Sequence, residues 1–118
     1  MLLSPRTLLR AEGLLVFGVA LFLYQRTGSS WLLFFVLSLA PDLSMLGYAA
    51  GPRVGASTYN LVHTYALPLI LAAYGLWSGN SLVMSLALIW LAHIGADRFL
   101  GFGLKYPTKF NDTHLQRV

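Results

Sequence analysis

The stretch LVMSLALIWLAHIGADRFL, residues 82–100, decides the fold class of this chain. It is long and apolar enough to cross the hydrocarbon core of a bilayer, which takes about 20 mostly apolar residues. Three further stretches of the same kind precede it, at residues 8–24, 31–50 and 54–77. We therefore expect a single transmembrane domain over residues 1–118, all-α, with four spanning helices and a tail over 101–118 that is too polar to span.

The composition excludes an ordinary soluble enzyme and a disordered chain. Of the 118 residues 57% are hydrophobic and 10% are charged, whereas soluble domains carry about 25% charged residues. The chain has no cysteine, which excludes disulfides, thiol catalysis and zinc–thiolate sites. The net charge of +4 lies beside apolar spans, so we expect the bilayer and its anionic headgroups as partners, and no nucleic acid.

The connectors predict an up-down bundle. Residues 25–30, 51–53 and 78–81 are short and rich in turn-forming residues, so each helix runs antiparallel to the next. An even number of spans puts both termini on one side, and the positive-inside rule makes that side the cytoplasm. Of the eight basic residues, Arg26 alone falls on the other side, and the terminal side carries Arg6, Arg10, Arg53, Arg98, Lys105, Lys109 and Arg117.

Ionisable residues inside the spans predict a polar centre. Each charge near a helix centre costs about 2.5–3.5 kcal/mol, so such groups should face the bundle interior and find partners. The up-down topology brings them to one layer in the cytoplasmic half. The expected polar centre consists of the ionisable residues Glu12, Asp42, His63, His93 and Asp97 together with the amide of Asn60.

Residue spacing and two prolines support this convergence. His93 and Asp97 are four residues apart and share one helix face, and Asn60 and His63 are three apart. Prolines at positions 41 and 68 are expected to interrupt the second and third helices beside these groups.

Imidazoles and carboxylates without thiols suit a divalent cation: zinc, manganese or magnesium. We expect Asp42, His63, His93 and Asp97 as its ligands. Glu12 and Asp42 are the candidate catalytic carboxylates, with Glu12 as a general base or further ligand. An anionic headgroup would be bound by Arg53, Asn60, Arg98 and Lys105. This set predicts metal-dependent hydrolysis or transfer on an anionic amphiphile entering from the inner leaflet.

Two other functions remain open. A metal-free polar network could lock a non-catalytic structural or partner-binding bundle. A small ion or proton carrier acting as a homo-oligomer would also place acids and histidines in a bundle. The nearly uncharged outer half offers no visible polar path for a carrier.

Two long strings carry a resemblance to a known family. They are PDLSMLGYAAGPRVGASTYNLVHTYALP at 41–68 and IWLAHIGADRFLGFGLKYPTKFNDTHL at 89–115, with RAEG at 10–13. The chain resembles the uncharacterised bacterial membrane family catalogued as domain of unknown function 4260. The resemblance implies a short four-helix protein of the bacterial inner membrane and no assigned activity. The His and Asp pattern is also loosely similar to membrane-bound metal-dependent hydrolases.

Overall fold

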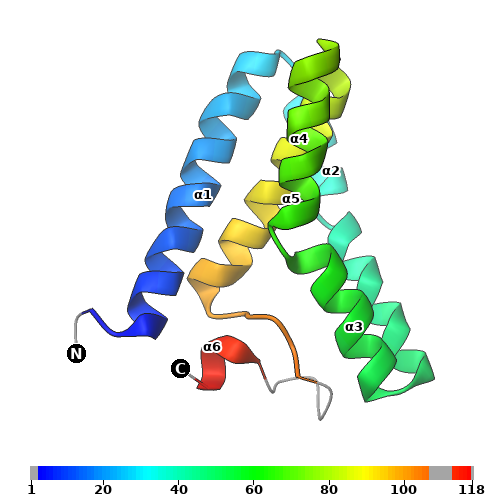
Figure 1. Ribbon diagram of the computed structural model, residues 1–118. Helices are drawn as coiled ribbons and strands as arrows, with labels where there is room; N and C mark the ends of the chain where they lie inside the picture. Colours follow the sequence, from blue (N-terminus) through cyan, green and yellow to red (C-terminus); the bar gives the residue numbers. More distant parts are fainter. Residues whose placement is uncertain (1–2, 107–112, 118) are drawn as a thin grey trace.

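The computed structural model describes residues 3–106 and 113–117, and within these ranges the chain is helical with no β-strand (Figure 1). Capping side chains help to define where helices begin. Ser4 caps the first helix by accepting a hydrogen bond from the Thr7 amide. The elements are α1 (Pro5–Thr27), α2 (Trp31–Leu37), the 3₁₀ helix η1 (Ala40–Ala50), α3 (Pro52–His63), α4 (Ala66–Ser78), α5 (Ser81–Leu100) and α6 (His114–Arg117).

These helices form four segments long and apolar enough to cross a membrane, which confirms the predicted all-α membrane bundle. The four are α1, α2 with η1, α3 with α4, and α5. Every boundary agrees with the sequence prediction to within three residues. The start of α1 and the short helix α6 lie at the same end of the bundle, called the terminal end below (Figure 1).

The second and third spans are broken, and a proline defines each break. A proline ring excludes the carbonyl of the residue four positions earlier from helical geometry. Accordingly α2 ends at Leu37, four residues before Pro41. Likewise α3 ends just before Thr64, which is extended with ψ 148° and lies four residues before Pro68. On the side of the two breaks that faces the terminal end, η1 and α3 lean away from α1 as a pair (Figure 1).

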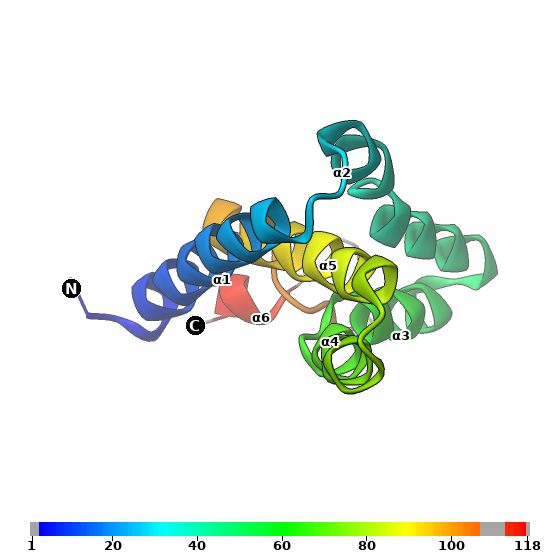
Figure 2. The ribbon, with the colours of Figure 1, turned by 90° about the horizontal axis from the view of Figure 1, so that it is seen from above.

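Helix α5 is unbroken and occupies the centre of the bundle. Half of the residues in its most apolar stretch are buried, whereas at most 17% are buried in the corresponding stretches of the other spans. Seen from above, α5 lies between α1 and α4 (Figure 2). It packs on α1 at Gly13 and Gly95, where a Cβ added to Gly95 would come within 2.7 Å of the Gly13 carbonyl oxygen. This close approach fixes α5 as the axis on which the other helices are arranged.

The tail folds under the terminal end. The Asn60 side chain holds the Lys105 backbone through two hydrogen bonds, donating to its carbonyl at 2.7 Å and accepting from its amide at 2.6 Å. The Arg6 guanidinium donates to the Leu115 carbonyl at 2.9 Å and so joins α6 to the start of α1. Of the basic residues used to orient the chain, Lys109 lies outside the described residues.

Candidate metal centre

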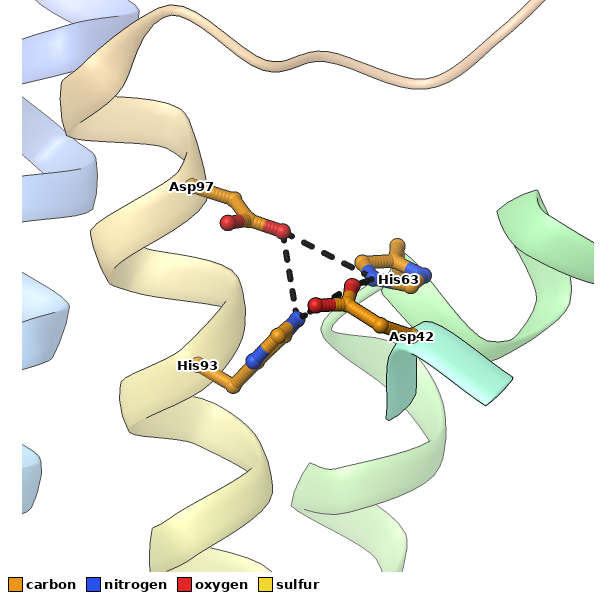
Figure 3. A group of neighbouring side chains, drawn as sticks. All are labelled: Asp42, His63, His93 and Asp97. Atoms are coloured by element: carbon orange, nitrogen blue, oxygen red, sulfur yellow. Dashed lines mark hydrogen bonds and ion pairs between the residues drawn. The ribbon is translucent and has the colours of Figure 1, made fainter. Parts of the chain in front are cut away.

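Four of the predicted site residues meet in one cluster, called the metal cluster below: Asp42, His63, His93 and Asp97 (Figure 3). Asp42 lies in the first turn of η1, and His63 is the last residue of α3. Both therefore sit at a helix break. His93 and Asp97 face them from successive turns of the unbroken α5.

The ligand atoms lie close together. Nε2 of His93 is 3.1 Å from Oδ1 of Asp42 and 3.2 Å from Oδ2 of Asp97. Nε2 of His63 is 3.3 Å from the same Asp42 oxygen and 3.6 Å from the Asp97 oxygen. The two Nε2 atoms are 3.2 Å apart. All four ligand atoms lie within 4.8 Å of one another.

The orientation of His63 is fixed by the helix that carries it. Its Nδ1 lies 2.9 Å from the Tyr59 carbonyl oxygen, and its ring stacks on the Tyr59 ring at 3.7 Å. A carbonyl oxygen only accepts hydrogen bonds, so Nδ1 carries the proton and donates it. In the neutral ring the Nε2 lone pair then points at the cluster, which is the arrangement that metal-binding histidines adopt.

This tautomer limits the ways in which a metal-free cluster can place its protons. Two neutral rings offer at most one proton between the paired Nε2 atoms, and two carboxylates remain beside them with no cation. If both rings are protonated instead, two N–H groups point at each other across 3.2 Å. A divalent cation removes both conflicts, since it accepts all four lone pairs and balances the two negative charges.

The cluster is open on one side. The His63 side chain is 1% exposed and that of His93 is 9% exposed, while Asp97 is 19% exposed and Asp42 is 40% exposed. Access to the ligand atoms is therefore greatest beside Asp42.

Three of the predicted headgroup-binding residues surround the cluster at the terminal end. Arg98 is buried and donates to the His63 carbonyl at 2.9 Å and the Phe102 carbonyl at 3.2 Å. Asn60 binds the Lys105 backbone, as described above. The Lys105 ammonium lies 4.4 Å from the centre of the Tyr59 ring. Burial lowers the pKa of Lys105, although the nearby carboxylates act in the opposite direction.

Two predicted residues lie elsewhere. Glu12 is exposed on α1 and is not a member of the metal cluster. The adjacent Gly13 faces α5, and successive residues point about 100° apart around a helix, so Glu12 is turned away. Arg53 is exposed in the first turn of α3, at the far end of that helix from His63.

The part played by Tyr59 was not predicted from the sequence. Its carbonyl and its ring together hold His63. The signal was present, because Tyr59 and His63 are four residues apart and so share a helix face.

Comparison with known proteins gives a family and no further relative. No curated protein and no solved structure matches the chain. A family model described as a domain of unknown function, DUF4260, matches residues 6–118. The match covers the four spans except for Pro5, together with all four residues of the metal cluster, and the chain belongs to this family.

Proposed function

We propose that Asp42, His63, His93 and Asp97 bind one divalent cation, and that this centre hydrolyses or transfers a group on an amphiphile with an anionic headgroup. We place the protein in the bacterial inner membrane with both termini in the cytoplasm, as the distribution of basic residues favours. The single observation that carries the proposal is the set of distances between the four ligand atoms.

These distances fit a small tetrahedral site. Bonds of about 2.0–2.1 Å to four tetrahedral ligands separate the ligands by about 3.3–3.4 Å. Five of the six separations between the ligand atoms run from 3.1 to 3.6 Å, and all six are within 4.8 Å. Zinc favours this geometry and this mixture of imidazole and carboxylate. Manganese is the next choice, and magnesium the last, because magnesium prefers oxygen ligands and octahedral geometry.

The charge of the cluster supports the same assignment. Two carboxylates contribute two negative charges, and the two neutral imidazoles contribute none. A divalent cation makes the assembly neutral, which lowers the cost of keeping it inside a membrane. A monovalent ion would leave one charge without compensation.

The exposure of the ligands suggests how the centre works. Catalytic zinc sites commonly have three protein ligands and one open position, where a bound water reaches a pKa of about 7. His63, His93 and Asp97 are the three least exposed members of the cluster. Asp42, the most exposed of the four ligands, would be the one to give up its position to a water, and its released carboxylate would then be placed to receive the proton of that water. We assign the general-base role to Asp42, because Glu12 lies outside the cluster.

We assign the anionic headgroup to the terminal end, beside Lys105. Its ammonium reaches the Tyr59 ring that stacks on His63, so a phosphate or carboxylate bound there would lie next to the metal cluster. Asn60 and Arg98 act in support, since Asn60 holds the Lys105 backbone and Arg98 holds the end of α3. Arg53, at the far end of α3, is available to headgroups at the membrane surface.

Elemental analysis of the purified protein tests this proposal. The chain without substitutions should hold about one zinc or manganese ion, and His93→Ala and His63→Ala should lose it. The matched control is His114→Asn, because His114 lies outside the cluster and should leave the metal content unchanged. Negligible metal in every sample, or equal metal in all four, would refute the proposal.

The same variants separate the two alternatives. A structural bundle predicts that His63→Ala and His93→Ala lower the melting temperature with no metal detected in any sample. A carrier predicts metal or proton flux in proteoliposomes that depends on the same histidines.

A further inference from the structure

An apolar pocket adjoins the metal cluster on its membrane side. The pocket has a volume of about 310 Å³ and lies where the break between α2 and η1 meets the end of α3 and the middle of α5. Its lining includes Ala40, Pro41, Val62, Ile89 and Trp90, and every lining residue is apolar. We call it the chain pocket.

The largest side chain that lines the chain pocket, Trp90, offers no unpaired hydrogen-bonding group to a ligand. The Trp90 indole N–H donates to the Val62 carbonyl at 2.6 Å, so both groups are satisfied within the protein. A headgroup would find no partner at this wall, whereas a hydrocarbon chain needs none. The chemistry of the pocket therefore matches an acyl chain.

Two residues that line the pocket are the sequence neighbours of two residues of the metal cluster. Pro41 directly precedes Asp42, and Val62 directly precedes His63. Ile89 lies one turn before His93 on α5, about 6 Å further from the terminal end. The pocket thus begins one helical turn deeper in the membrane than the cluster, beside the exposed carboxylate of Asp42.

We propose that the chain pocket holds one acyl chain of the amphiphile on which the metal centre acts. The inference rests on the proposed function and names its substrate class, a lipid bound by a single chain. In a bilayer the chain of a lipid points to the midplane and its headgroup to the surface. A chain in this pocket would have that orientation and would bring the bond between chain and headgroup to Asp42 and its neighbours.

The size of the pocket agrees with one chain. A methylene occupies about the volume of a water molecule, roughly 30 Å³, so the pocket holds on the order of ten methylenes. A second, larger groove of about 540 Å³ runs between α1 and α4. None of its lining residues directly precedes or follows a residue of the metal cluster, so it provides an internal control.

Photolabelling tests the inference. The probe is palmitic acid with a diazirine in its chain, and the protein is reconstituted in phosphatidylcholine liposomes. We expect labelling at Trp90 and Ile89 that excess unlabelled palmitate reduces several-fold. Ala40→Trp, which fills the chain pocket, should reduce it to a similar extent. Ala73→Trp fills the groove between α1 and α4 and should leave it unchanged.

The outcomes separate this inference from the proposed function, because metal content is measured on the same samples. Labelling at Trp90 that is saturable, in a protein without metal, supports the acyl-chain site while the metal centre fails. Labelling spread evenly over the lipid-facing helices, or unaffected by palmitate, overturns the acyl-chain site even if metal is bound. The competition experiment needs no substitution, so misfolding of Ala40→Trp cannot obscure the result.

Discussion

Replacing Asn60 by aspartate should release the tail from the terminal end of the bundle. Asn60 is the only side chain that both donates to and accepts from the Lys105 backbone within the part of the chain that the structure describes. Asn60→Asp keeps the shape of the side chain and removes its donor. The new carboxylate oxygen would face the Lys105 carbonyl oxygen across the 2.7 Å that a hydrogen bond now spans.

The size of the effect follows from these two bonds. Leaving a half-buried carbonyl without its donor costs about 1–3 kcal/mol. The other bond, from the Lys105 amide, is kept and gains strength from the negative charge, so the loss is not doubled. A cost of about 1–3 kcal/mol raises the fraction of undocked tail roughly 5- to 150-fold, since about 1.4 kcal/mol corresponds to a factor of ten.

Hydrogen exchange followed by mass spectrometry measures this opening at the Lys105 amide. The matched control is Asn80→Asp, because Asn80 only accepts, from the amides of Leu82 and Val83 at the start of α5. Aspartate is an equally good cap there and interacts favourably with the helix dipole. Exchange of the Lys105 amide should therefore not accelerate in Asn80→Asp. The reasoning fails if Asn60→Asp leaves the Lys105 amide protected, or if both substitutions accelerate its exchange equally.

Two further predictions concern the α1–α5 contact and the tail. Gly13→Ala should lower stability by about 1–3 kcal/mol, because its Cβ would meet the Gly95 carbonyl oxygen at 2.7 Å. Gly18→Ala, where an added Cβ meets nothing within 4 Å, should raise stability by about 0.5–1 kcal/mol; equal shifts in an SDS unfolding titration would contradict this. Burial lowers the pKa of His114 from its ordinary 6.5, so docking of the tail is fully stable above pH 6.5 and weakens as pH falls through the lowered pKa. The Nδ1 atom of His114 accepts a hydrogen bond from the Leu104 amide at 2.7 Å, and it cannot do so once it is protonated. Protection of the Leu104 amide against hydrogen exchange should therefore fall in acid, and in His114→Asn it should not depend on pH. Protection that persists in acid in the unsubstituted chain would count against the argument.

The fold could be predicted because the membrane imposes a simple rule on the sequence. A spanning helix needs a long apolar run, and this chain has four such runs separated by short connectors. The ends were less accurate, as in α1, which begins at Pro5 and ends at Thr27 instead of spanning 8–24. Polar residues in the first and last turns extend a helix beyond its apolar run, because the cap and not the apolar run decides where it ends.

The cluster could be predicted only in part. His93 and Asp97 are four residues apart on one helix, so their common face follows from spacing alone. The direction in which Glu12 points does not follow, because most residues around it are apolar on every side of α1. It is decided by Gly13, where the absence of a side chain lets α1 approach α5 closely. The glycine was visible in the sequence, but its partner helix was not.

The positions of the two helix breaks favour a functional reading of the cluster. Unbroken helices would satisfy every backbone group inside the membrane, and a break leaves carbonyl groups that need other partners. At the end of α3 the His63 carbonyl accepts from Arg98, so satisfying this break requires burying a charged guanidinium. A bundle selected for stability alone gains nothing from this arrangement. Both breaks lie at the metal cluster, where they turn Asp42 and His63 toward α5, and this is the result expected if the cluster must bind an ion.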